Sequence, residues 1–461
     1  MSERFTAGRV PDAGITALFT TEARWQAWLA VEAALSQTQA ALGLIPEEAA
    51  AAITEGCSSE WLDTVRIREG IARSSHPLMP LILELSRVVG EPHSAWIHWG
   101  ATTQNVTQTG DVLVLRQAHT VILKLLSRTL EALADLADRS AEMVMPGRTH
   151  GQHAVPITFG FKAASWIDEF GRHGERLQEI EPRLFRALIG GAAGTFASLG
   201  AQGKEVQAGV AERLGLMPTP VPSRSALDAF AEFACVLGLL AATCGKIGRE
   251  IYSHMKTEYG EVEEPVPAGT IGSSTMPQKR NPQLCQDVIG MSAEVRALVP
   301  LALETAISEH EADNQPSVMF DALMRGCSLM GDVLARVNLI VGDLRLNPER
   351  MRANLALSGG TISAEAIMLE LGRTLGRQEA HEVVYQAAQR AATEGVAFLE
   401  LLRTDPRITT YLEEDALKAL LEPEGHVGLS ATLAREQAKV ARQKVLELNG
   451  KLDTFQTKSA H

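Results

Sequence analysis

The sequence predicts an all-α protein built around a central bundle of long helices. Ala and Leu dominate a chain of 461 residues in which only 5% are aromatic, and this composition favours helix over strand. Apolar residues also recur at helical spacing over several long stretches. Long helices with apolar faces in the middle of a chain are typical of a helix bundle.

The first long helix is expected over 21–42. Apolar residues recur at helical spacing from Trp25 to Leu42, and Thr21 is available as an N-terminal cap. Gly43 follows directly, at the position where a glycine commonly ends a helix.

The second long helix is expected over 111–143, because no Pro or Gly interrupts it before Pro146. Its apolar stripe consists of Val112, Leu115, Ile122, Leu125, Leu126, Leu130 and Leu133. Helices of similar scale are expected over 156–189, 226–258 and 283–312. Pro300 should kink or split the last of these.

Four segments break the helical pattern: 90–110, 190–200, 260–282 and 355–363. At about 150 residues per domain, the chain length gives about three domains. We therefore expect an N-terminal helical domain (1–111), a central helix-bundle domain that carries the loop 260–282 (112–354), and a C-terminal helical domain (355–461).

Charge and composition exclude several classes of protein. Lys plus Arg number 43 and Asp plus Glu 56, a formal net charge of −13. This charge argues against nucleic-acid binding, which needs a basic face, although a local pocket can still accept an anionic substrate. The chain begins without an apolar signal segment, and its most apolar run, 233–245, is too short to span a bilayer.

The cysteines also point to a soluble protein of the cytoplasm. They are odd in number, scattered and without a CxxC pair, so we expect reduced thiols rather than disulfides or a zinc site. They are Cys57, Cys235, Cys244, Cys285 and Cys327.

The loop 260–282 is the strongest candidate for a functional segment. It contains more than twenty residues without helical period, and loops of this length are usually functional or disordered. Disorder suits GEVEEPVPAG (260–269), whereas 273–282 combines hydroxyls, an amide and two cations beside an expected helix start at Pro282. A helix N-terminus with Lys279 predicts an anion-binding loop, and the alternative is a plain linker.

Three shorter segments also carry polar chemistry. His150 and His153 are three residues apart, a spacing open to a metal ion, but only two local ligands favour instead a catalytic or hydrogen-bonding histidine in a turn. Thr102–Asn105 offers hydroxyls and amides to a carboxylate, and the alternative is an ordinary capped turn. His76 in Ser-Ser-His-Pro is, taken alone, more often structural. We find no dinucleotide or P-loop pattern and expect no cofactor.

These segments together resemble a known family. Residues 272–282 (GSSTMPQKRNP) resemble the signature loop of the aspartase/fumarase superfamily, and 147–154 (GRTHGQHA) and 98–110 (HWGATTQNVTQTG) resemble its two other motifs. The resemblance implies an all-α, three-domain protomer in a homotetramer whose active sites are each built from three subunits. It also implies that a C–N or C–O bond is cleaved or formed with release of fumarate, except in a lactone-forming carboxymuconate cycloisomerase branch.

The resemblance assigns roles to individual residues. Ser274 resembles the catalytic base, which Gly269 and Gly272 would allow to close over the site, while His150 resembles the general acid and His76 its neighbouring histidine. The implied substrate-binding residues are Thr102, Thr103, Gln104, Thr149, Ser273, Met276, Lys279 and Asn281.

The chemistry explains these residue types. Removing a proton next to a carboxylate creates a dianionic aci-carboxylate, which needs preorganised hydrogen-bond donors and cations. A serine acts as a base only where its alkoxide is stabilised, and a histidine can protonate the leaving group.

Different parts of the sequence resemble different branches of the superfamily. Segment 355–388 resembles the cycloisomerase branch and lacks the Ser/Arg pattern for a nucleotide phosphate, whereas His150 and His76 resemble adenylosuccinate lyase. Gln286 stands where many lyases have Glu, and Asn105 and Gln108 where related branches usually have Asp. Fewer fixed anions favour a substrate with several carboxylates.

We therefore predict a lyase that releases fumarate from an N-substituted aspartate or related succinyl polycarboxylate. The alternative is a 3-carboxy-cis,cis-muconate cycloisomerase, and adenylosuccinate lyase is less favoured. A catalytically silent, structural tetramer is a third possibility, which the presence of Ser274, Lys279 and Asn281 disfavours. We expect no cofactor, no metal, no nucleic acid and no membrane among its partners.

Overall fold

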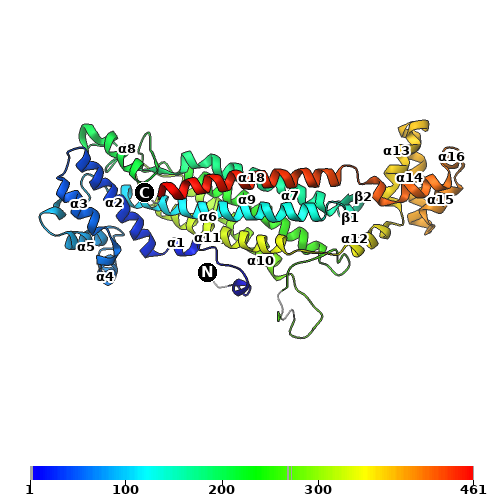
Figure 1. Ribbon diagram of the computed structural model, residues 1–461, viewed down its shortest axis with the longest axis horizontal. Helices are drawn as coiled ribbons and strands as arrows, with labels where there is room; N and C mark the ends of the chain where they lie inside the picture. Colours follow the sequence, from blue (N-terminus) through cyan, green and yellow to red (C-terminus); the bar gives the residue numbers. More distant parts are fainter. Residues whose placement is uncertain (1–3, 267–268, 271–272, 460–461) are drawn as a thin grey trace.

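The prediction of an all-α protein is confirmed. The computed structural model describes residues 4–266, 269–270 and 273–459, and most of them are helical. Figure 1 shows an elongated molecule in which long helices run side by side, with a group of shorter helices at each end.

The long helices form the bundle that the sequence predicts. Helix α9 packs against α7 and α10, and α6 packs against α7 and α11. The last helix, α18 (Ser430–Ser459), runs back along α6 and α7. The bundle helices are α6 (Thr103–Arg139), α7 (Phe159–Leu184), α9 (Asp228–His254), α10 (Gln283–Thr305) and α11 (Gln315–Gly342).

Helices shorter than those of the bundle lie at its two ends. At the N-terminal end lie α1 (Ile15–Leu18), α2 (Thr21–Ala41), α3 (Glu47–Gly56), α4 (Thr64–Ser74), α5 (Met79–Val89) and α8 (Gly203–Arg213). At the other end lie α12 (Pro348–Leu355), α13 (Ala364–Leu375), α14 (Arg377–Glu394), α15 (Phe398–Thr404), α16 (Pro406–Thr409) and α17 (Glu414–Leu421).

The described strands form three small pairs. Strands β1 (Val144–Thr149) and β2 (Gln152–Thr158) are antiparallel and form a hairpin. The other pairs are two residues long: β3 (Arg186–Ala187) with β4 (Met217–Pro218), and β5 (Val262–Glu263) with β6 (Arg345–Leu346).

Helix α6 confirms the predicted stripe but begins earlier than expected. All seven stripe residues are buried. The helix starts at Thr103, inside the segment predicted as a break, because Asn105 Oδ1 accepts the N–H of Thr102 and the first turns pack into the core. Gly110 lets α2 approach, since a Cβ there would lie 2.5 Å from Trp28 Cδ1.

Three other expected boundaries need correction. Thr20, not Thr21, caps α2 by accepting the N–H of Ala23. Helix α7 begins at Phe159 rather than 156, because the preceding residues pair in β2. Helix α10 ends at Thr305 rather than at 312 and is not split by Pro300, whose side chain is exposed.

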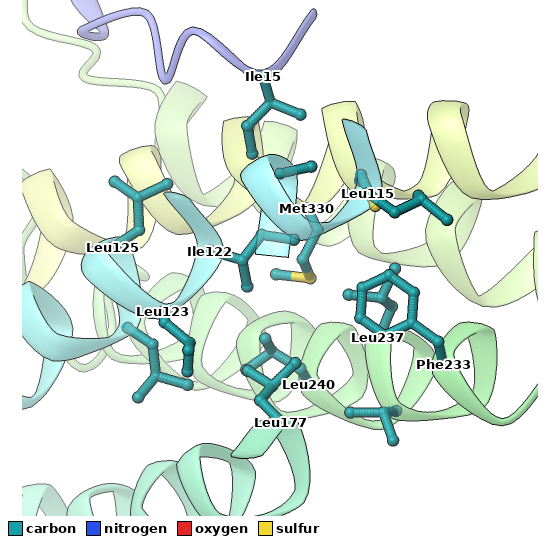
Figure 2. Close-up of a cluster of buried hydrophobic side chains, with 14 of the residues drawn as sticks. Ile15, Leu115, Ile122, Leu123, Leu125, Leu177, Phe233, Leu237, Leu240 and Met330 are labelled. Atoms are coloured by element: carbon teal, nitrogen blue, oxygen red, sulfur yellow. The ribbon is translucent and has the colours of Figure 1, made fainter. Parts of the chain in front are cut away.

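The core runs along the bundle. Figure 2 shows Ile122, Leu177, Leu237 and Met330 meeting at its centre from α6, α7, α9 and α11. Burial of each such side chain contributes about 1.5–3 kcal/mol. The five cysteines are unpaired, and three of them lie in this core: Cys244, Cys285 and Cys327.

A separate small core holds α13–α17 together. The first predicted domain boundary, at 111/112, falls within α6, and α18, from the predicted C-terminal domain, contributes Ala438 and Leu448 to the bundle core. The three-domain division remains a prediction.

Helix α9 is the one described helix that is long and apolar enough to cross a membrane by length and composition. However, 67% of its most apolar window is buried inside the bundle, as in the core helix of a soluble protein. The absence of a membrane partner and the cytoplasmic location remain predictions.

Candidate active site

His150 lies at the tip of the hairpin formed by β1 and β2. Thr149 pairs with Gln152, so the turn contains only His150 and Gly151, and both have positive φ (53° and 77°). Two consecutive positive φ values are the geometry of a tight hairpin turn, which suits Gly but is uncommon for His. The turn leaves Thr149 and His150 exposed, where each can contact a substrate.

Close to its tip, the hairpin is tied to the root of the long loop. Arg148 Nη2 and Nη1 donate to Glu261 Oε1 and Oε2 (2.7 and 3.0 Å). The Arg148 guanidinium also lies over the ring of Tyr259, with its Cζ 4.8 Å from the ring centroid. The hairpin and the loop therefore belong to one structural unit within a single chain.

The expected disorder of 260–269 is wrong for its first part. Glu261 and Glu264 are 0% and 1% exposed. Glu264 accepts the backbone N–H groups of Leu284 and Cys285 (3.0 and 2.9 Å), so it caps α10. Because this carboxylate already occupies the start of α10, an anion at the loop must be bound mainly by side chains rather than by the helix N-terminus predicted for it.

The loop itself projects from the side of the bundle before α10 (Figure 1). Ser274, Met276 and Lys279 are exposed, and Ser273 Oγ accepts the N–H groups of Thr275 and Met276 (3.3 and 3.1 Å). Gly269 has a φ of +83°, while Gly272, which was also expected to permit closure, lies outside the described residues.

A polar cavity of about 430 Å³ opens beside this loop. Lys279, Asn281 and three arginines line it, together with the capping carboxylate of Glu264. The arginines are Arg9, Arg280 and Arg345. Arg280 pairs with Glu263 (2.6 Å), whereas Arg9 Nη2 is buried without a hydrogen-bond partner in the described structure. The cavity thus combines cationic groups with an unsatisfied donor.

A second group of candidates lies at the start of α6. His76 Nδ1 accepts the N–H groups of Leu78 and Met79 (3.3 and 3.0 Å), so the neutral ring carries its proton on Nε2. That nitrogen lies 3.4 Å from Thr103 Oγ1. His76 therefore has the structural role considered for it, at the start of α5, and still presents a donor beside Thr103.

Gln104, behind these groups, is fully engaged. Its Nε2 donates to Gln108 Oε1 (2.8 Å) and to the Arg224 carbonyl (2.7 Å), and its Oε1 accepts from Arg224 Nε (3.0 Å). Asn105 is completely buried, and its Oδ1 accepts the N–H groups of Thr102 and Gly191. This geometry favours a positioning role for Gln104 over the substrate contact that the resemblance implies.

One chain does not bring these two groups together. The 37 residues of α6 separate Thr103 from the segment that leads into β1. At about 1.5 Å per residue, the helix is about 55 Å long. Figure 1 accordingly shows the start of α6 and the hairpin at opposite ends of the bundle.

Several residues that contribute to the candidate site could hardly be predicted from the sequence. Arg9 and Arg224 are single arginines in segments without a motif, so only the fold places them at the cavity and behind Gln104. Glu261 gave no signal either, because GEVEEPVPAG equally suits a solvated linker and only the fold buries this side chain.

The described residues contain no cluster of His, Cys, Asp or Glu that can hold a metal ion. His153, the partner of His150 in the metal alternative, faces Arg148 across the hairpin. Burial, and secondly the charge of Arg148, lower the pKa of His153.

Comparisons with known proteins identify the family of the chain. A family model described as lyase matches residues 9–297, and one described as adenylosuccinate lyase C-terminus matches residues 360–436. The chain belongs to the aspartase/fumarase superfamily. The predicted family is thereby confirmed, and the protein is an enzyme of this superfamily.

Individual members of the superfamily cover almost the whole chain. An N-acetyl-S-(2-succino)cysteine lyase of Enterococcus italicus is 39% identical over 91% of this chain and 92% of its own. A 3-carboxy-cis,cis-muconate cycloisomerase of Pseudomonas aeruginosa is 37% identical over 90% and 92%. The crystal structure of a fumarate lyase from Mesorhizobium sp. BNC1 superimposes with a TM-score of 0.88 at 34% identity, covering 95% of this chain and 99% of that one.

Proposed function

We propose that this protein is a fumarate-releasing lyase that acts by reversible β-elimination on a 2-substituted succinate. The observation that carries the proposal is the cationic cavity beside the loop, with Lys279 and Arg9, whose Nη2 has no hydrogen-bond partner among the described residues. A succinyl group carries two carboxylates, and fixed cations in a partly enclosed site attract such a substrate despite the net charge of −13.

Ser274 removes a proton from the carbon next to one carboxylate. The electron pair first resides on that carboxylate as the aci-carboxylate. The positive charge of Lys279 and a hydrogen bond from Asn281 stabilise it. The pair then forms the C=C bond of fumarate as the bond to the leaving atom breaks, and His150 gives that atom a proton. Thr149, Ser273 and Met276 complete the contacts, and no cofactor or metal is required.

The atom that leaves the succinyl group is either nitrogen or sulfur. The sequence favours nitrogen, as in an N-substituted aspartate. The names of two relatives, both N-acetyl-S-(2-succino)cysteine lyases, favour a thioether instead. Both substrates share the succinyl half that the cationic cavity would bind, so one site can be tested with both.

We further propose that the active site forms between copies of the chain in a homotetramer. Thr102 and Thr103 from one copy, ordered from behind by Gln104 and aided by His76, would hold the substrate against the hairpin and loop of others. The length of α6 supports this proposal, because these groups lie too far apart to meet within one chain.

A cycloisomerase remains the second candidate. The name of the Pseudomonas aeruginosa relative favours it, as does a lactonizing enzyme from Pseudomonas putida with a TM-score of 0.87 and 33% identity. The same acid and base would then serve addition of a carboxylate oxygen within 3-carboxymuconate. Adenylosuccinate lyase is less favoured, because 355–388 lacks the pattern for a nucleotide phosphate.

The decisive experiment is a substrate panel followed by ultraviolet absorbance. It contains an N-substituted aspartate, N-acetyl-S-(2-succino)cysteine, adenylosuccinate and 3-carboxymuconate, each with wild type and with Ser274→Ala. We expect fumarate from one of the first two, loss of this activity in the variant, and no change after chelation. Turnover of 3-carboxymuconate alone would replace the lyase proposal with the cycloisomerase, and full activity of Ser274→Ala would remove Ser274 as the base.

A further inference from the structure

His254, the last residue of α9, has a carboxylate on each side of its ring. Its Nδ1 lies 2.5 Å from Glu261 Oε2, and its Nε2 lies 3.1 Å from Glu250 Oε1. The residue is 5% exposed, and Glu261 is completely buried. Ionised carboxylates only accept hydrogen bonds, so both ring nitrogens must donate, and His254 is held as an imidazolium.

The charges around His254 come from several elements. Lys162 on α7 binds Glu250 (2.5 Å), and Arg148 on β1 binds Glu261 in a bidentate pair. Asn354 on α12 donates to Glu261 Oε1 (2.8 Å). Three cations and two carboxylates thus alternate in a chain from α7 to β1. Two further titratable groups lie beside Arg148: His153, across the hairpin on β2, and Tyr259, whose ring lies against the guanidinium.

This chain of charges ends at the candidate site. Arg148 is two residues from His150 and adjacent to Thr149, and Glu261 immediately precedes β5, at the root of the loop that carries Ser274. A single imidazolium therefore connects the end of α9, the hairpin and the loop root.

We propose that His254 is a positioning residue whose imidazolium fixes the hairpin with His150 against the root of the loop with Ser274. The roles of His150 and Ser274 rest on the proposed function, but the connection itself does not. When His254 loses its proton, one ring nitrogen presents a lone pair to a carboxylate oxygen at hydrogen-bond distance. That contact becomes repulsive, and the hairpin loosens from the loop.

The direction of the pH dependence follows from the surroundings of the ring. Burial alone would lower the pKa of His254, but the hydrogen bonds to Glu250 and Glu261 outweigh it, and the pKa is raised above its ordinary value of 6.5. A raised pKa means that the contribution of the His254 imidazolium is fully present below pH 6.5 and is lost as the pH rises through the raised value.

The test is amide hydrogen exchange of peptides covering 144–158, in the full-length protein from pH 6.5 upward. After correction for the intrinsic rate, we expect wild-type exchange to accelerate several-fold in one step above pH 6.5. His254→Gln should exchange fast already below that step and show no step of its own. Glu250→Gln removes one carboxylate, lowers the pKa of His254, and should move the step to lower pH.

His119→Gln is the matched control. His119 is also buried in the bundle, its Nε2 lies 2.8 Å from the Leu177 carbonyl, and burial lowers its pKa to about 4, so it is neutral. Its loss should reduce stability without changing exchange of the hairpin. The proposal is overturned if His254→Gln exchanges like wild type, or if the step in Glu250→Gln does not move. Glu250→Gln carries the test alone if His254→Gln does not fold. The measurement needs no substrate, so a failed substrate panel leaves its result intact.

Discussion

The two ends of α6 hold their candidate residues by different chemistry. At the hairpin end, Arg148 is fixed by buried ions, with Glu261 and His254 at the centre. At the N-terminal end, amide groups hold the first turn of α6: Asn105 accepts the N–H of Thr102, and Gln104 bonds to Gln108 and Arg224. The first arrangement depends on protonation, whereas the amides of the second keep one charge state at every ordinary pH.

This difference indicates a division of labour. The hairpin and loop would carry the proton transfers, and their geometry depends on groups that themselves titrate. The start of α6 would bind a carboxylate that keeps its charge through the reaction, and neutral donors suffice for that purpose. Variants at each end of α6 can therefore be compared with one another.

The largest effect is expected from removing a histidine at each end. His150→Ala should lower kcat by about 10²–10⁴-fold, the range for loss of an acid–base group. His76→Ala should lower activity through loss of the donor beside Thr103. If the site takes these groups from different copies, mixed assemblies from equal amounts should regain activity at about a quarter of their sites, because a closed symmetric oligomer combines the chains at random. Activity of refolded mixtures measures this recovery. No recovery would place both groups in one chain.

The next effect separates the two kinds of support. Glu261→Ala leaves the charges of Arg148 and His254 buried without their carboxylate and should destabilise the protein by about 3–5 kcal/mol. Asn105→Ala removes one neutral acceptor for two N–H groups and should cost about 1–3 kcal/mol. Urea unfolding followed by circular dichroism measures both. Equal losses in the free energy of unfolding would mean that the charged groups around Glu261 stabilise the protein no more than the amide of Asn105 does.

The family and the long helices could be predicted from the sequence because both depend on continuous segments of the chain. The stripe of α6 and the motifs at 98–110, 147–154 and 272–282 are continuous in the chain. The connections behind the site were beyond this information. Glu261 binds Arg148 across 113 residues, and Glu264 caps α10 from 20 residues away, so neither role follows from composition. Tertiary burial also overrode the weak helix propensity of 103–110.

Acid should weaken the hairpin end in particular. Burial alone would raise the pKa of Glu261, but hydrogen bonds from His254, Arg148 and Asn354 outweigh it and lower the pKa to about 2. A depressed pKa gives stability that is complete above the ordinary value of 4.5 and is lost as the pH falls toward about 2. Hydrogen exchange of 144–158 should therefore accelerate in acid more than that of 103–110. Parallel acceleration of both segments would show a global transition instead.

The smallest effect is expected from Asn105→Asp, which restores the acid that related branches usually have. Asn105 is completely buried, and its Oδ1 already accepts the N–H groups of Thr102 and Gly191. A carboxylate accepts the same two bonds and lies favourably at a helix N-terminus, while the Asn105 Nδ2 that it replaces has no partner in the described structure. The charge of the new aspartate would be buried beneath the first turn of α6 and would not contact the substrate. We therefore expect the KM for a succinyl substrate to change by less than about threefold, well below the tenfold that 1.4 kcal/mol represents. Steady-state kinetics decide the matter. A much larger rise in KM would show that the charge at this position is felt by the substrate, and that the absence of acids at 105 and 108 selects polyanions.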